Sequence, residues 1–154
     1  MNRLALIIAT AGYTGYVPFA PGTIGSLVGL AVYAALIATH APLAVPAAVV
    51  VLATAGVWAA TRAERHFSSI DPGPVVIDEV VGMLVSLAWI DASATTAVAG
   101  FLLFRIFDIV KPFPAARLER LGGGVGIVAD DVMAGAYANV SLRVLLAIAP
   151  GWFA

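Results

Sequence analysis

The sequence predicts an all-α, multi-pass membrane protein, and three observations lead to this fold class. Of the 154 residues, 62% are hydrophobic and only 11% are charged, and the mean hydropathy of +1.02 lies far above a soluble average. Residues 4–61 contain no Asp, Glu, Lys or Arg. Apolar stretches close to the roughly 20 residues that a bilayer-spanning helix needs recur along the chain. We expect one domain that fills residues 1–154.

The N-terminal part is expected to form a short apolar helix and then a loop at residues 17–27. Proline and glycine are frequent in this loop, so the uncharged region cannot be one continuous helix. A loop that opens a helix presents backbone amides, and here the hydroxyls of Thr23 and Ser26, to an anion. An ordinary helix-starting turn would have the same composition, and the loop alone does not decide between the two.

Two helical hairpins, with about four membrane crossings, are predicted after the loop. The elements are, in order, helix 26–39, turn 40–42, helix 43–61, polar segment 62–74, helix 75–90, turn 91–93 and helix 94–110. A last helix is expected at 127–149, after a glycine-rich connection in which the run 122–124 has no evident role. Arg143 interrupts the apolar run of this helix. The helix is therefore expected either to cross the membrane or to lie at the interface.

Four crossings would bring the polar segments to one side of the membrane. The loop at 17–27 and the segments at 62–79 and 105–131 would share that side. It would hold most of the basic residues, which are Arg62, Arg65, Arg105, Lys111, Arg117 and Arg120. The turns at 40–42 and 91–93 contain neither Lys nor Arg, so the positive-inside rule places the shared side in the cytoplasm.

Carboxylates gather at the same side, at or near the ends of predicted helices. They are Asp71, Asp78, Glu79, Asp108, Asp130 and Asp131. A charge at the bilayer centre costs about 3 kcal/mol even on the most lenient scale, so these groups must lie near the interface, pair with cations or bind a metal. The chain has no cysteine and only two histidines, which favours a hard, oxygen-bound cation, first of all Mg²⁺. The alternative is that the acids only complement helix dipoles in first turns.

The stretch FRIFDIVKPFP at 104–114 adds cations to these acids. Arg105, Asp108 and Lys111 follow one another at three-residue spacing, which places them along one side of a helix. Two cations beside carboxylates and an amide-rich loop indicate phosphate chemistry. The sequence contains no Walker lysine loop and no histidine pair, and water attack and an aspartyl phosphoenzyme both stay open. The net charge of −1 gives no indication of a nucleic-acid partner.

Four segments, taken in order, resemble the successive motifs of the phosphatidylglycerophosphatase A family. They are APGTIGSL at 20–27, DPGPVVIDEVVG at 71–82, FRIFDIVKPFP at 104–114 and GIVADDVMAGAYAN at 126–139. The resemblance implies an all-helical, magnesium-dependent phosphatase of the bacterial cytoplasmic membrane, with membrane lipids around it. Its substrate would be the phospholipid phosphatidylglycerophosphate, converted to phosphatidylglycerol at the cytoplasmic face.

The resemblance and the residue chemistry together assign roles to individual side chains. The expected Mg²⁺ ligands are Asp78, Glu79, Asp108 and Asp131. Asp130 is expected to be a ligand or the general base, Arg105 and Lys111 to bind and stabilise the phosphoryl group, Thr23 and Ser26 to help hold it, and Asp71 to support the site from outside the ligands. Gly82 and Gly135 are expected to allow close helix approach.

Two other functions are compatible with parts of this pattern. A cation or anion transporter would also carry carboxylates, but it would distribute polar residues through the membrane depth, whereas both predicted hairpins have uncharged middles. A phosphatase for another lipid phosphate, such as phosphatidic acid, would use the same groups. The sequence does not distinguish one metal ion from two, and it gives no oligomeric state.

Overall fold

The computed structural model describes residues 2–91, 93–149 and 151, and the regular elements in them are all helical, as expected. The α-helices are α1 (Arg3–Ala9), α2 (Pro21–Ile37), α3 (Ala44–Phe67), α4 (Ile77–Leu87), α5 (Ala94–Val110), α6 (Ala115–Leu118) and α7 (Gly123–Ile148). Short 3₁₀ turns lie at Thr14–Tyr16 and Glu119–Leu121. The ends of the predicted domain 1–154, and residue 92 of the predicted turn, lie outside the described residues.

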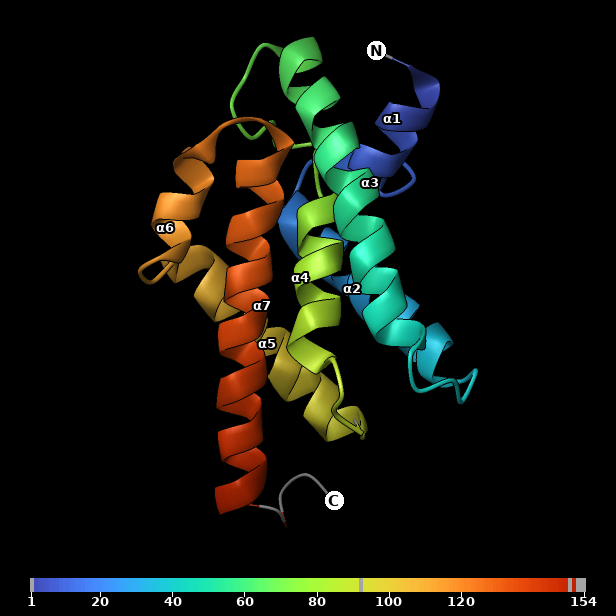
Figure 1. Ribbon diagram of the computed structural model, residues 1–154, viewed down its shortest axis with the longest axis vertical. Helices are drawn as coiled ribbons and strands as arrows, with labels where there is room; N and C mark the ends of the chain where they lie inside the picture. The colour runs from blue at the N-terminus through green and yellow to red at the C-terminus, as the bar shows by residue number, and fades with distance from the viewer. Residues whose placement is uncertain (1, 92, 150, 152–154) are drawn as a thin grey trace.

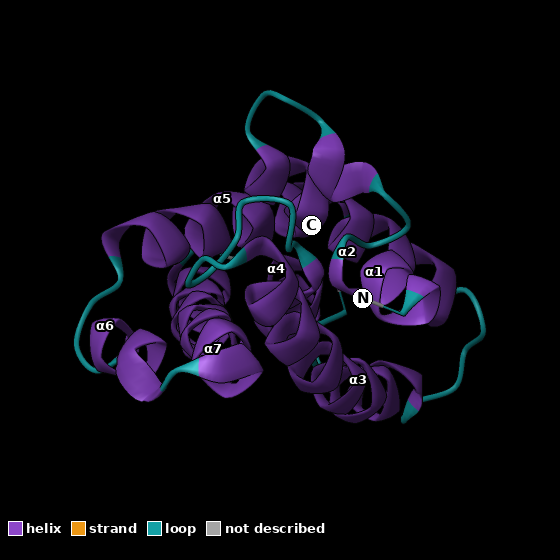
Figure 2. Ribbon diagram, turned by 90° about the horizontal axis from the view of Figure 1, so that it is seen from above, coloured by secondary structure: helices purple, strands orange, loops and turns teal. Residues whose placement is uncertain are grey.

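The short helix α4 lies at the centre of the bundle. It contacts α2, α3, α5 and α7, and the view from above shows these helices around it (Figure 2). Only Glu79 and Val85 of its 11 residues are not fully buried. The side chains at its centre, Met83 and Leu84, are completely inaccessible and belong to the main apolar core. Every other long helix is therefore positioned against α4.

Two helices, α3 and α7, are long and apolar enough to span a membrane among the described residues. Only 22% and 28% of their apolar windows are buried, so neither resembles the enclosed core helix of a soluble protein. Helix α2 is also apolar, with 17 residues. These helices indicate membrane association, and they do not by themselves establish four crossings.

The helix predicted over residues 75–90 is shorter in the structure. Helix α4 has 11 residues and is about 16 Å long, against a hydrocarbon core of roughly 30 Å. Before it, the amide of Val76 donates to Ala9 O at 2.9 Å and thus ties this segment to α1. After it, Ala88 has extended backbone angles. The apolar run in the sequence is longer than the helix because its ends are buried against neighbouring elements.

Two other boundaries differ from the predictions because of proline and glycine. Helix α2 begins at Pro21, not at residue 26, since proline is well suited to the first helical position. Helix α7 begins at Gly123, not at residue 127. Gly122 and Gly123 have φ of +69° and +62°, and a side chain at Gly124 would collide with Val57 O on α3. The glycine run therefore has a role, which is to turn the chain and seat α7 on α3.

The prediction that Gly82 and Gly135 allow close helix approach is confirmed. A side chain at Gly135 would collide with the carbonyl oxygen of Gly82, and one at Gly82 would collide with Phe104 and with Asp131 O. Helices α4 and α7 thus meet backbone to backbone, and they run in the same direction (Figure 1). This contact brings the start of α4 beside the acidic part of α7.

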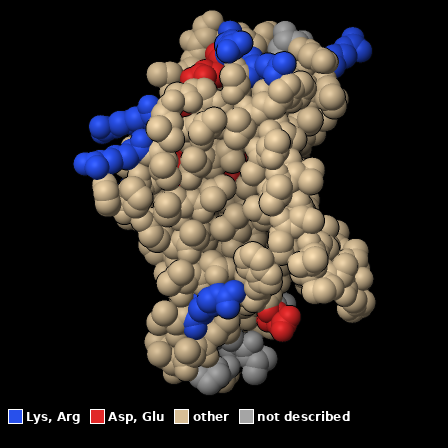
Figure 3. Space-filling model, in the orientation of Figure 1, with Lys and Arg blue, Asp and Glu red and all other residues tan. Residues whose placement is uncertain are grey.

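Charged side chains are unevenly distributed over the surface. Figure 3 shows most of the visible Lys and Arg at one end of the molecule and on the adjoining flank. A broad zone of other residues separates them from a small charged group near the opposite end. The chain turns that follow α2 and α4 both lie toward that opposite end (Figure 1). The fold is therefore polarised along its long axis.

Candidate functional site

Three carboxylates from two helices form the centre of the site. Asp78 and Glu79 occupy the first turn of α4, and Asp131 comes from α7. One oxygen of each lies within 4.8 Å of the others. Asp78 and Asp131 are only 6% and 3% exposed. Carboxylates buried together in this way repel one another and lose hydration, so they require a compensating charge.

The unsatisfied oxygens of these side chains show that a cation fits here. Asp78 Oδ1, Glu79 Oε2 and Asp131 Oδ2 are buried, and none has a hydrogen-bond partner among the described residues. Buried polar atoms are nearly always paired, so orphaned oxygens on three neighbouring carboxylates call for a ligand. A donor set made only of carboxylate oxygen suits a hard divalent cation better than a soft one. The cluster can therefore bind a metal ion.

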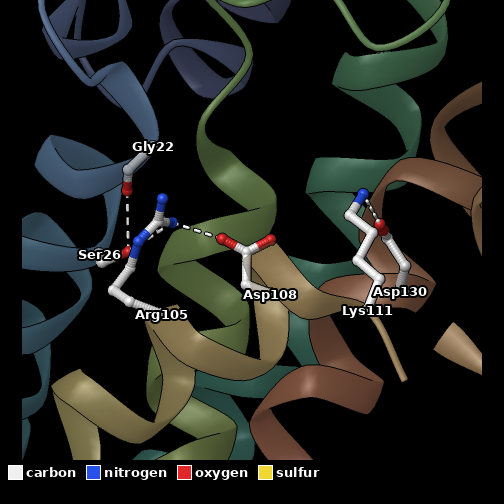
Figure 4. Close-up of polar contacts among 6 residues, drawn as sticks. All are labelled: Gly22, Ser26, Arg105, Asp108, Lys111 and Asp130. Atoms are coloured by element: carbon white, nitrogen blue, oxygen red, sulfur yellow. Dashed lines mark hydrogen bonds and ion pairs between the residues drawn. The ribbon is translucent and has the colours of Figure 1, made fainter. Parts of the chain in front are cut away.

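Arg105 on α5 bonds to Asp108 and to the beginning of α2. Its Nη1 atom donates to Asp108 Oδ2 and, at 3.4 Å, to Ser26 Oγ, and Ser26 in turn donates to Gly22 O at 2.8 Å. Figure 4 shows the guanidinium between Ser26 and Asp108. The predicted phosphate-binding residue Ser26 is buried, and its hydroxyl contacts Arg105.

Gly22 allows α2 to start directly beside the acidic cluster. A side chain at this position would collide with Glu79 Oε1 and come within 3.2 Å of Arg105 Nη1. Helix N-termini favour anions through their dipole and free amides. Thr23 lies in the same first turn and is half-buried. The start of α2 and the Arg105 guanidinium thus form a positive region next to the three carboxylates.

Lys111 lies on the other side of the site and is bonded to two carboxylates. Its Nζ atom donates to Asp130 Oδ2 at 2.6 Å and to Glu119 Oε1 at 3.1 Å, and in Figure 4 this pair lies apart from the Arg105 group. Burial alone would lower the pKa of Lys111, but the bonds to Asp130 and Glu119 outweigh burial and raise it. Lys111 is therefore a permanent cation whose donors already serve Asp130 and Glu119.

The remaining predicted residues take different positions. Asp130 is 4% exposed, and its Oδ1 atom has no partner among the described residues. Asp108 is not one of the three clustered ligands, although its carboxyl lies against Asp131. Asp71 lies in the exposed loop before α4, with φ of +46°, and Lys111 and Glu119 are among its charged neighbours. The structure brings the predicted acids to one region, where Asp108 pairs with Arg105 and Asp130 pairs with Lys111.

Two contributors to the site were not predicted from the sequence. Glu119, a bonding partner of Lys111, is one of several charges in a polar connection, and nothing in its local pattern sets it apart. Gly22 had a weak signal, because glycine next to proline in a helix-starting segment permits close backbone approach. Its contact with Glu79 depends on packing between elements far apart in the chain.

Comparisons with known proteins find relatives over most of the chain. Residues 7–146 match the family described as Phosphatidylglycerophosphatase A. Proteins named "Phosphatidylglycerophosphatase A" from Escherichia coli and Haemophilus influenzae are 32% and 36% identical over 149 and 145 residues, which cover 95% and 91% of this chain and 84% and 86% of theirs. A Bacteroides thetaiotaomicron protein named "Putative phosphatidylinositol-3-phosphatase" is 42% identical over 148 residues, 92% of each chain. No solved structure matches the chain significantly.

Proposed function

Because the chain belongs to the phosphatidylglycerophosphatase A family, a family of phosphatases, we propose that it hydrolyses the terminal phosphate of phosphatidylglycerophosphate. The reaction forms a bond from a water oxygen to phosphorus and breaks the bond from phosphorus to the glycerol oxygen. Phosphatidylglycerol and phosphate are the products. The observation that carries the proposal is the buried group of Asp78, Glu79 and Asp131, with unpaired oxygens next to a positive region.

The proposed cofactor is Mg²⁺, held by Asp78, Glu79 and Asp131, with Asp108 as a fourth ligand through the oxygen that does not accept from Arg105. The all-carboxylate donor set and the hardness of phosphate oxygens both favour this ion. When bound, Mg²⁺ would stabilise negative charge on the phosphoryl oxygens and promote ionisation of water. Without it, the three carboxylates would repel a phosphate dianion.

Arg105 is proposed to bind the phosphoryl group together with the first turn of α2. The guanidinium offers several donors in a plane that matches phosphate oxygens, and Ser26 and Asp108 hold it in place. The Thr23 hydroxyl and the amides at the start of α2 would contribute further donors. Arg105 therefore stabilises charge that develops during transfer, which is the main catalytic requirement in phosphoryl transfer.

Asp130 is proposed as the general base, with Lys111 as its partner. One oxygen of Asp130 is bonded to Lys111 and the other is free of partners among the described residues, so the free oxygen can accept a proton from the attacking water. Lys111 supplies the compensating charge, and it contributes to phosphate binding through the same positive field. Asp71 is proposed to support the Lys111 side of the site from its loop.

The membrane arrangement is proposed to have the basic end in the cytoplasm. Four crossings in two hairpins are compatible with the positions of the turns after α2 and α4, if the whole segment 75–90, of which α4 is the helical part, crosses enclosed by the other helices and does not itself meet lipid. Helix α7, at 26 residues, is long enough to cross as well. The charged headgroup would then enter from the cytoplasmic interface of the bacterial inner membrane.

The test is phosphate release from phosphatidylglycerophosphate by the purified chain in detergent, with and without Mg²⁺. We expect release that depends on the metal and is lost in Asp78→Asn, with Asp91→Asn as the matched control because Asp91 is exposed at the other end of α4. Metal-independent release, or full activity in Asp78→Asn, would contradict the mechanism.

The Bacteroides relative gives a reason to test a second lipid phosphate. Its printed name refers to a phosphoinositide, and a phosphate monoester is common to that lipid, phosphatidic acid and phosphatidylglycerophosphate. The same assay with phosphatidylinositol 3-phosphate and with phosphatidic acid compares the headgroups directly. We expect the highest kcat/KM with phosphatidylglycerophosphate, and a higher value with either alternative would reassign the substrate.

A further inference from the structure

Helices α4 and α7 contact one another with a constant offset in sequence. Asp78 lies with Asp131, Gly82 with Gly135, and the carbonyl of Ser86 with Asn139. The two residues of each pair are 53 positions apart in the sequence. The contacts repeat every four residues, so one face of each parallel helix meets one face of the other. The metal cluster is the first layer of this interface, and the asparagine is the third.

Asn139 forms directional bonds at the end of α4. Its Nδ2 atom lies 3.2, 3.1 and 3.0 Å from the carbonyl oxygens of Val85, Ser86 and Ala88. Helix α4 ends at Leu87, and the last carbonyls of a helix have no partner within it. One amide group on α7 therefore donates to the carbonyls at the C-terminal end of α4.

Arg143 completes the arrangement one turn further along α7. Its Nε atom donates to Asn139 Oδ1 at 2.8 Å, which orients the amide so that Nδ2 faces the carbonyls. Its Nη2 atom donates to Ala88 O and Trp89 O, both at 3.1 Å. The arginine that interrupts the apolar run of α7 thus has a partner inside the fold.

The other two layers of this interface contribute no directional bond between α4 and α7 among the described residues. Gly82 and Gly135 meet through close packing, with Phe104 and Val85 beside them, and the carboxylates repel one another, whereas Asn139 donates hydrogen bonds from α7 to α4. A slide by one residue would move Asp131 by about 1.5 Å relative to α4. Metal–ligand distances vary by only about 0.2 Å. The ligand set therefore depends on contacts that hold the two helices at a fixed offset.

We propose that Asn139 is a positioning residue that fixes the register of α7 on α4, and so holds Asp131 at the correct distance from Asp78 and Glu79. Arg143 acts through Asn139 by orienting its amide. The inference rests on the proposed metal site. It assigns the affinity of that site for a bound cation partly to a contact two helical turns away.

The test measures Mn²⁺ affinity by electron paramagnetic resonance on the full chain in detergent, together with the metal-free melting temperature. In Asn139→Leu we expect the Mn²⁺ dissociation constant to rise about tenfold or more, within the 10–100-fold range for residues that support metal ligands. The matched control is Val144→Ala, which truncates an exposed side chain on the same helix and should change the constant less than about twofold.

The paired measurement separates positioning from stability. A residue that only caps α4 would lower the metal-free melting temperature and leave the Mn²⁺ constant of the folded protein unchanged, and that result would overturn the inference. If Asn139→Leu does not fold, Arg143→Met is measured in its place. A higher Mn²⁺ dissociation constant in Arg143→Met supports the inference, and an unchanged one overturns it. Absence of Mn²⁺ binding in the wild-type chain would refute the metal site itself, and the proposed function with it.

Discussion

Lys111 Nζ lies 2.6 Å from Asp130 Oδ2 and thereby joins the end of α5 to the acidic turn of α7. The lysine is in the left-handed region, with φ of +45°, so the chain turns sharply after α5 and points the ammonium back at the bundle. Asp130 is buried and would otherwise carry an uncompensated charge. The bond therefore stabilises the fold and also belongs to the site.

Lys111→Met should destabilise the protein because it leaves Asp130 buried without its cation. We expect a loss of about 2 kcal/mol in the free energy of unfolding, less than for a fully enclosed pair because Lys111 is partly exposed. Adding Asp130→Asn should recover most of this loss, since it removes the unpaired charge. Denaturant unfolding of both single variants and the double variant checks the coupling. Equal stability of Lys111→Met and wild type would contradict this reading of the pair.

Asp131→Asn should separate activity from stability. Phosphate release should fall on the order of 100-fold, because a metal ligand is weakened. The metal-free protein should melt at a higher temperature than wild type, because one of three mutually repelling buried charges is gone. Thermal melting in the presence of a chelator, next to the phosphate assay, measures both. A lower metal-free melting temperature would argue that the three carboxylates are balanced by protein groups alone.

Gly22→Ala should lower activity although it favours the helix. The new methyl group would collide with Glu79 Oε1 and crowd the Arg105 guanidinium, so both would move. The control is Gly73→Ala, because nothing lies within 4 Å of a side chain there. We expect kcat/KM to fall about tenfold or more in Gly22→Ala and to be unchanged in Gly73→Ala, as for other residues that orient catalytic groups. Similar activities of the two variants would show that α2 does not approach the site so closely.

The fold class and the acidic residues were predictable because they depend on local signals. Long apolar runs predict helices, and carboxylates at the ends of such runs indicate a functional site because charged groups are rare there. Four ligands were expected together, Asp78, Glu79, Asp108 and Asp131, and the structure groups three of them, without Asp108. Gly82 and Gly135 were predictable for a similar reason, since small residues in apolar helices commonly mark contacts.

The parts that could not be predicted depend on which distant segments meet. Arg105 contacts Ser26 across 79 positions of sequence, and no local pattern gives that partner. The apolar run at 75–90 predicts a spanning helix, but a run that is buried inside the protein looks the same as one that faces lipid. The role of the glycines at 122–124 depends on the packing of α7 against α3, which no local pattern gives.

Mg²⁺ should stabilise the folded protein in proportion to its occupancy of the site. A ligand that binds only the folded state at 100 times its dissociation constant adds about 2.7 kcal/mol, so the melting temperature should rise measurably with Mg²⁺. The rise should disappear in Asp131→Asn and persist in Asp91→Asn. Differential scanning fluorimetry in detergent checks this. A rise of the same size in all three proteins would indicate a general salt effect on the surface.

The proposed topology places His40 and Ser68 on opposite sides of the membrane. His40 follows α2 and Ser68 follows α3, and both are exposed. Because the chain has no cysteine, His40→Cys and Ser68→Cys each carry a single thiol. A membrane-impermeant maleimide added to intact spheroplasts should label the first variant, and it should label the second only after the membrane is broken. Labelling of both from one side would mean that α3 does not cross, because it is the helix that separates the two positions.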